Sequence, residues 1–149
     1  MRSLDSDSGS DALSPFNEWT IASDIREIDR VVLAVTSLCE AAGFPGKVCR
    51  LNIPVALTEA IANAIERGNG GDAARSVRVM ARIDDTGLCV EVTDEGQGFD
   101  VDAVRALADD GDWIEREDGR GVFLMYALMD QVETWCDAGH TVRLVLRRS

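Results

Sequence analysis

Residues 55–67 read VALTEAIANAIER, and the fold prediction depends on this stretch. Its small and apolar side chains recur at steps of three and four, which is typical of a helix with one buried face. Glu59 and Asn63 lie four residues apart and therefore share a helix face. Gly68 predicts where the helix ends. Its start stays open, near Lys47 or later, because Pro54 can be either a first helical residue or a kink.

Other helices and strands are expected on both sides of this helix. Alternating apolar residues and turn signals predict strands at 16–21, 76–83, 88–93, 131–135 and 141–147. Helical spacing predicts a helix capped by Ser23 or Asp24 and ending at Gly43, a helix at 122–129, and a weak one at 101–108. This order predicts an α+β fold: a two-layer sandwich with helices on one face of a mostly antiparallel, mixed sheet.

Length and charge narrow the class of protein. The 149 residues suit a polar tail at 1–15 followed by one domain at 16–149. Fifteen basic and 27 acidic residues give a net charge of −12, which disfavours direct binding to nucleic acid or to an anionic membrane. The charge suits a basic partner protein, although it can also serve solubility alone. No secretory signal is recognised at the start, so we expect a cytoplasmic protein.

Cysteine and histidine offer little chemistry. Cys39, Cys49, Cys89 and Cys136 are scattered without a C-x-x-C pair, so we expect buried, reduced thiols. The chain has one histidine, His140, which argues against a His-rich metal site.

The first candidate site is the pair Glu59 and Asn63. A carboxylate beside a neutral amide suits a base that polarises a hydroxyl group, together with an oxygen ligand for Mg²⁺. The alternative is an ordinary solvated face of a helix, since charged side chains are mostly exposed.

The second candidate is residues 94–99, DEGQGF, directly after a predicted strand. Gly96 and Gly98 let the backbone approach a ligand closely, and Asp94 could accept a hydrogen bond from an exocyclic amine. The alternative is a plain turn with an ordinary aspartate.

The third candidate is Gly119-Arg120-Gly121, which leads into the helix expected from Val122. Free N–H groups at a helix start bind anions, and a guanidinium can reach phosphate oxygens. The alternative is a flexible loop. The sequence contains neither a Walker A motif nor a Rossmann fingerprint.

Together, the texts EAIANAIERGN, DEGQGFD and GRGVFLMYALMDQVE resemble, in order and spacing, the signatures of the GHKL ATPases. Within that superfamily the sequence is most similar to the anti-sigma factor serine-protein kinases of the RsbW and SpoIIAB type, over about residues 16–147. The resemblance implies the Bergerat ATP-binding fold. One departure is Arg67, which stands where the family motif usually has a histidine.

The resemblance also implies roles for individual residues. Glu59 would be the general base, and Asn63 would hold Mg²⁺. Asp94 would accept a hydrogen bond from the adenine amino group, with residues 100–118 as a lid. The remaining ATP-contacting positions would be Gly96, Gly98, Gly119, Arg120, Gly121, Val122 and Thr141, although Thr141 can equally be a plain strand residue.

The function implied by the resemblance couples two activities. The protein would sequester a sigma factor, and it would phosphorylate Ser or Thr of a STAS-type anti-anti-sigma protein with ATP and Mg²⁺. Members commonly form homodimers. Two alternatives stay open: a non-catalytic, ATP-dependent protein-binding module of the same fold, and a plain interaction domain whose glycines are only turns.

Overall fold

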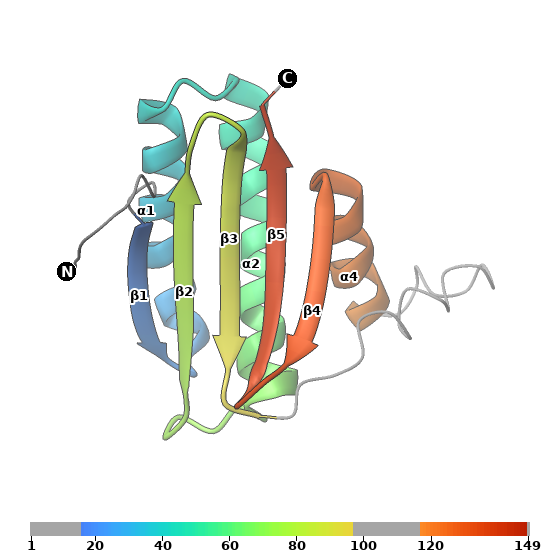
Figure 1. Cartoon of the computed structure of the whole chain (residues 1–149). Helices are drawn as coiled ribbons and strands as arrows, with labels where there is room; N and C mark the ends of the chain where they lie inside the picture. Colours follow the sequence, from blue (N-terminus) through green and yellow to red (C-terminus); the bar gives the residue numbers. More distant parts are fainter. Residues whose placement is uncertain (1–15, 97–116, 149) are drawn as a thin grey trace.

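The computed structural model describes residues 16–96 and 117–148, which form a sheet covered by helices (Figure 1). The expected tail at 1–15, the expected helix at 101–108 and Gly98 lie outside the described residues.

Within the described residues, the sheet has five strands in the order β1-β2-β3-β5-β4. Their bounds are β1 Phe16–Ala22, β2 Ser76–Ile83, β3 Gly87–Asp94, β4 Gln131–Cys136 and β5 His140–Arg147. All four pairings between these strands are antiparallel, so the described part of the sheet contains no parallel pair. The predicted α+β sandwich is therefore confirmed, with a sheet that is antiparallel rather than mixed in its described strands.

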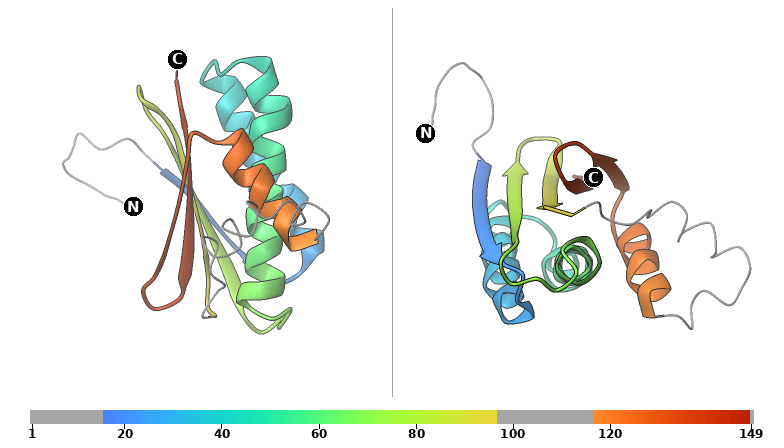
Figure 2. Two further views of the ribbon diagram at one scale, coloured as in Figure 1. Left: turned by 90° about the vertical axis from the view of Figure 1, so that its right-hand side faces the viewer. Right: turned by 90° about the horizontal axis from the view of Figure 1, so that it is seen from below.

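The described helices cover one face of the sheet, as predicted (Figure 2). They are the 3-10 turn η2 Ile25–Glu27, α1 Ile28–Ala41, the π-helical turn η3 Val48–Asn52, α2 Ile53–Asn63, the π-helical turn η4 Ala64–Gly68 and α4 Glu117–Leu128. Because α2 contacts both α1 and α4, it lies at the centre of the helical layer. Residues on the α4 side of α2 therefore lie in the contact between these two helices.

Asp24, not Ser23, caps the first helical segment. The Asp24 carboxylate accepts the backbone N–H of Arg26 at 2.9 Å, as an N-cap residue does. Ser23 is buried instead, and its hydroxyl donates to the carbonyl of Arg75 at 2.8 Å. The two polar residues therefore have different roles, one local and one tertiary.

Pro54 lies inside a continuous helical segment. The N–H of Ile53 bonds the carbonyl of Val48, five residues back, so the turn before the proline is π-helical. A proline lacks an N–H, and its ring collides with the carbonyl four residues earlier. A wider turn accommodates both effects. The helix that carries Glu59 and Asn63 thus begins before Pro54.

The segment Val48–Gly68 has 21 residues and is, by length and composition alone, apolar enough to cross a membrane. Many of its apolar side chains are instead buried in the core of the domain, although Leu51 is exposed. Leu57 and Ile61 are fully buried against the sheet and the neighbouring helices. Burial of such a side chain contributes about 1.5–3 kcal/mol, so this segment is a core helix that fixes the position of its polar residues.

Candidate functional site

The polar pair of α2 faces the start of α4. A methyl group built on Gly121 would lie 2.5 Å from Oε1 of Glu59 and 3.9 Å from Nδ2 of Asn63. Glu59 and Asn63 are both only partly exposed. The structure thus brings three predicted site residues together, and the alternative of an ordinary solvated face does not describe this pair.

Asn63 has an unusual amide. Its Nδ2 is buried, and it has no hydrogen-bond partner among the residues that the structure describes. An unsatisfied buried donor costs about 1–3 kcal/mol, so native proteins retain few of them. An oxygen-rich ligand at this point would satisfy the donor. The Asn63 side chain would also offer its carbonyl oxygen to a hard cation such as Mg²⁺.

Asp94 lies at the end of β3, against the last turn of the helical segment that carries Glu59. Its side chain is 2% exposed. A Cβ on Gly68 would overlap the Asp94 carboxylate, so only glycine allows this approach. Oδ1 of Asp94 also accepts the N–H of Gly96 at 2.9 Å. The carboxylate is therefore held against two glycine backbones.

Gly96 itself lies directly on Gly68, because a Cβ at residue 96 would overlap the Gly68 carbonyl oxygen. Asn69 fastens this contact. Its amide donates to Oγ of Ser23 at 2.8 Å and to the carbonyl of Ser76 at 3.0 Å, and its Oδ1 accepts the N–H of Glu95 at 2.8 Å. One buried asparagine thus ties three segments to the end of the helix.

Strand register brings His140 to Asp94. The two residues are directly opposite each other in the β3–β5 ladder, and Nδ1 of His140 lies 3.5 Å from Oδ2 of Asp94. Thr141 is placed differently. Its Oγ1 lies 2.9 Å from Oγ1 of Thr93, and neighbouring residues of a strand point to opposite faces. The structure therefore brings His140, and not the side chain of Thr141, to the Asp94 carboxylate.

The start of α4 differs from the sequence prediction. The helix begins at Glu117 and not at Val122, so Gly119-Arg120-Gly121 is helical instead of forming a preceding loop. Glycine disfavours helix interiors by about 1 kcal/mol, which is why sequence reasoning placed the start after it. Only the first turn of a helix keeps N–H groups without an intrahelical acceptor. Gly119 is in that turn, whereas Gly121 lies beyond it and makes the close approach to Glu59.

Sequence reasoning missed Gly68, Asn69 and His140 as parts of this site. The sequence predicts Gly68 only as the end of the helix, which is correct but incomplete, and Asn69 stands only within the quoted motif. A glycine and an asparagine directly after a helix are so common as a terminator that the tertiary contacts leave no separate signal. His140 stood out only as the single histidine of the chain.

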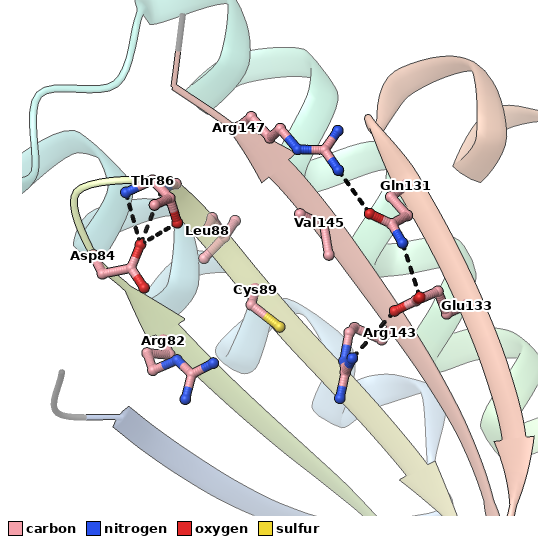
Figure 3. A pocket seen from close by; sticks show the side chains of 11 residues that line it. Arg82, Asp84, Thr86, Leu88, Cys89, Gln131, Glu133, Arg143, Val145 and Arg147 are labelled. Atoms are coloured by element: carbon pink, nitrogen blue, oxygen red, sulfur yellow. Dashed lines mark hydrogen bonds and ion pairs between the residues drawn. The ribbon is translucent and has the colours of Figure 1, made fainter. Parts of the chain in front are cut away.

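A hollow lies on the other face of the sheet, away from the helices (Figure 3). It contains none of the predicted site residues. Two of its arginines have polar partners: Arg143 bonds Glu91 at 2.9 Å and Glu133 at 3.1 Å, and Arg147 donates to Gln131 at 2.8 Å. This hollow is therefore not the candidate site.

Comparison with known proteins defines the class. Residues 21–146 match the family of histidine kinase-like ATPase domains, and the chain belongs to that family. The match includes the central helix with Glu59 and Asn63, as well as the glycines that contact Glu59 and Asp94.

Individual relatives point to one type of protein within this family. The chain is 28% identical to the serine-protein kinase RsbW of Listeria innocua over 116 residues, 74% of this chain and 73% of the relative. It is 27% identical to the RsbW of Staphylococcus epidermidis over 97 residues, 61% of each protein. The resemblance to kinases of the RsbW type, predicted from the motifs, is thereby confirmed.

A solved structure supports the fold. The structure of the RsbU and RsbW domains of a Mycobacterium tuberculosis protein superposes with a TM-score of 0.61 at 21% identity. The match covers 91% of this chain and 32% of that one, so the likeness extends over only about a third of the longer protein.

Proposed function

We propose that this chain binds ATP with Mg²⁺ on the face of α2 that meets α4, and transfers the terminal phosphoryl group to a serine or threonine of a partner protein. The observation that carries this proposal is the meeting of Gly121, Glu59 and Asn63, where a buried amide donor has no partner among the described residues. Relatives named serine-protein kinase support the reaction class.

The phosphate end of the nucleotide lies at Asn63 in this proposal. The Asn63 carbonyl oxygen would hold Mg²⁺, and its unpaired Nδ2 would donate to a phosphate oxygen. Bound Mg²⁺ neutralises the charge of the phosphates. The first turn of α4, with Gly119 and Arg120 and leading to Val122, would supply N–H groups at the positive end of the helix dipole.

Glu59 is the proposed base. Its carboxylate takes the proton of the acceptor hydroxyl group while the new oxygen–phosphorus bond forms and the bond to ADP breaks. A positioned base of this kind contributes about 10²–10⁴-fold in rate. The backbone of Gly121 fixes where the Glu59 carboxylate can stand, because it leaves no room on that side.

The base end of the nucleotide lies at Asp94 in this proposal. The Asp94 carboxylate would accept a hydrogen bond from the 6-amino group of adenine, and Gly96 and Gly98, which follow it in the sequence, would contact the nucleotide. Support comes from the burial of Asp94 and from its contact with Gly68, the last residue of the helical segment that carries Asn63.

The proposed biological role is based on the RsbW relatives. We propose a cytoplasmic anti-sigma factor that sequesters a sigma factor and phosphorylates a STAS-type anti-anti-sigma protein, acting as a homodimer. The net charge of −12 is compatible with a basic partner surface.

Two measurements test the proposal. Titration with a fluorescent ATP analogue and Mg²⁺ should show saturable binding, and radiolabelled ATP should label a cognate STAS protein. Saturable binding without transfer or ATP consumption would favour the non-catalytic, ATP-dependent binding module. A lack of binding would leave a plain interaction domain.

A further inference from the structure

We propose that His140 is a positioning residue: it holds the Asp94 carboxylate in the orientation that accepts the 6-amino group of a purine, so that adenine selectivity depends on this histidine. The inference rests on the nucleotide binding proposed above, and it adds a residue that the motifs did not include.

The placement of His140 is built into the sheet. His140 is the first residue of β5 and Asp94 the last of β3, and they form the final cross-strand pair of the ladder. The preceding turn contains Ala138 with φ 55° and Gly139 with φ 131°, and the N–H of Asp137 bonds the carbonyl of Gly139 at 2.8 Å. This tight turn fixes the backbone from which the imidazole projects.

The turn at residues 137–139 also lies close to the end of β3. A Cβ on Gly139 would overlap the carbonyl oxygen of Asp94, so the backbones on either side of the His140–Asp94 pair are in contact. His140 is 4% exposed and Asp94 is 2% exposed. A polar contact enclosed to this degree is little screened by water, which makes its geometry matter for a ligand.

The two oxygens of Asp94 have different neighbours. Oδ1 accepts the N–H of Gly96, and Oδ2 lies 3.5 Å from Nδ1 of His140. The terminal torsion of an aspartate is broad, so one contact alone does not fix the carboxylate plane. The hydrogen bond to Oδ1 and the imidazole beside Oδ2 together restrict the rotation of the carboxylate. The lone pairs that remain then point in a set direction, toward which an amino group can donate.

Selectivity follows from this arrangement. A carboxylate accepts hydrogen bonds and cannot donate them, so a fixed Asp94 favours a purine with a 6-amino group. If the imidazole is removed, Oδ2 loses its neighbour on β5 and the carboxylate can turn. The contact with the 6-amino group then weakens, whereas contacts to the phosphates, at the other end of the site, are unchanged.

The test compares two nucleotides in the full-length protein: ATP, and purine riboside triphosphate, which lacks only the 6-amino group. For His140→Leu we expect about tenfold weaker binding of Mg²⁺–ATP, the loss that corresponds to part of one charged hydrogen bond. Binding of purine riboside triphosphate should change by less than about twofold, because that ligand makes no 6-amino contact.

His140→Asn is the matched rescue variant, since its amide can place a donor close to where Nδ1 stands. It should bind both nucleotides within about threefold of the wild type, the scatter expected for one neutral hydrogen bond. Thermal unfolding of each variant without nucleotide reports whether the fold is kept. If His140→Leu does not fold, His140→Phe, which keeps a ring but has no ring nitrogen, carries the same two-nucleotide comparison.

Equal weakening of both nucleotides by His140→Leu would overturn the inference, since it would assign His140 a packing role. Unchanged binding of both would overturn it as well. These outcomes differ from a failure of the proposed function, in which the wild-type protein would bind neither nucleotide.

Discussion

The backbone of Gly121 stands so close to the Glu59 carboxylate that a methyl group at residue 121 would lie 2.5 Å from Oε1. The contact joins α4 to α2, two elements that enclose the acid–amide pair. A substitution at Gly121 should therefore affect activity more than stability, because the Oε1 atom that its Cβ would meet is at the far end of the flexible Glu59 side chain.

Gly121→Ala should therefore fold normally and lose activity. Alanine is favoured over glycine inside a helix by about 1 kcal/mol, so the free energy of unfolding should stay equal or rise slightly. The displaced Glu59 carboxylate should lower phosphoryl transfer by about 10²-fold. Chemical denaturation and radiolabel transfer measure the two effects. Transfer at the wild-type rate would show that the position of Glu59 does not matter.

Glu59→Gln should abolish transfer while leaving nucleotide binding nearly intact. The amide keeps the size of the side chain but cannot take a proton, so the rate should fall by about 10²–10⁴-fold. Glu59→Ala should behave in the same way. Glu66→Gln is the matched control, because Glu66 is an exposed carboxylate further along the same helical segment. An equal effect of Glu66→Gln would point to net charge and not to a base.

Asn63→Ala should weaken Mg²⁺–ATP binding and abolish transfer. Loss of one ligand to the cation and one donor to phosphate should cost about 10–100-fold in affinity. Without nucleotide, the variant should be as stable as the wild type or up to about 1 kcal/mol more stable, because an unsatisfied buried donor is removed. Calorimetric titration and denaturation measure both. A variant that binds as tightly as the wild type would remove Asn63 from the site.

Gly68→Ala should damage the base end of the site. A Cβ there overlaps the Asp94 carboxylate, which is buried and cannot simply move away, so we expect a loss of about 1–3 kcal/mol in stability. Nucleotide binding should fall with it. Gly46→Ala is the control: its Cβ would meet only the flexible end of Arg50. If Gly68→Ala and Gly46→Ala have the same free energy of unfolding, this result would contradict the close packing of Gly68 on Asp94.

The cysteines should react in order of burial. Burial raises the pKa of the Cys39 thiol from 9.0 to about 12, whereas Cys136 is exposed. A shift of three units lowers the thiolate fraction about a thousandfold at neutral pH. Cys136 should therefore react first with a thiol reagent, and Cys39 only on unfolding, as peptide mapping would show. Fast labelling of Cys39 in the folded protein would contradict its burial.

The same shift has a consequence for stability. The folded-state pKa of Cys39 is raised, so its contribution is fully present below pH 9 and is lost as the pH rises toward 12. Cys39→Ser should show less of this alkaline loss than the wild type when denaturation is followed against pH.

Local patterns predicted much of this molecule. Helical periodicity placed Glu59 and Asn63 on one face, and strand alternation placed all five strands, because both signals depend only on neighbouring residues. The fold class follows from the order of these elements. The glycines before Val122 misled the prediction, since tertiary contact with Glu59 outweighs their low helix propensity.

The base end of the candidate site could not be predicted in the same way. The contact of Gly68 with Asp94 depends on how a helix end meets a strand end, and that of His140 with Asp94 depends on the sheet register. Neither is encoded in a short stretch of sequence. Likewise, the π-helical turn before Pro54 results from one missing N–H and one steric clash, which sequence patterns alone left as two alternatives.

One helical segment carries both Asn63 and Gly68, so the number of residues between them sets the distance between these two positions. Residues 64–68 form a π-helical turn, which is wider than an α-helical turn. Removing one residue from this interval would therefore change the side of the helix on which Gly68 lies relative to Asn63. A change in the length of this interval would thus separate Gly68 from Asp94.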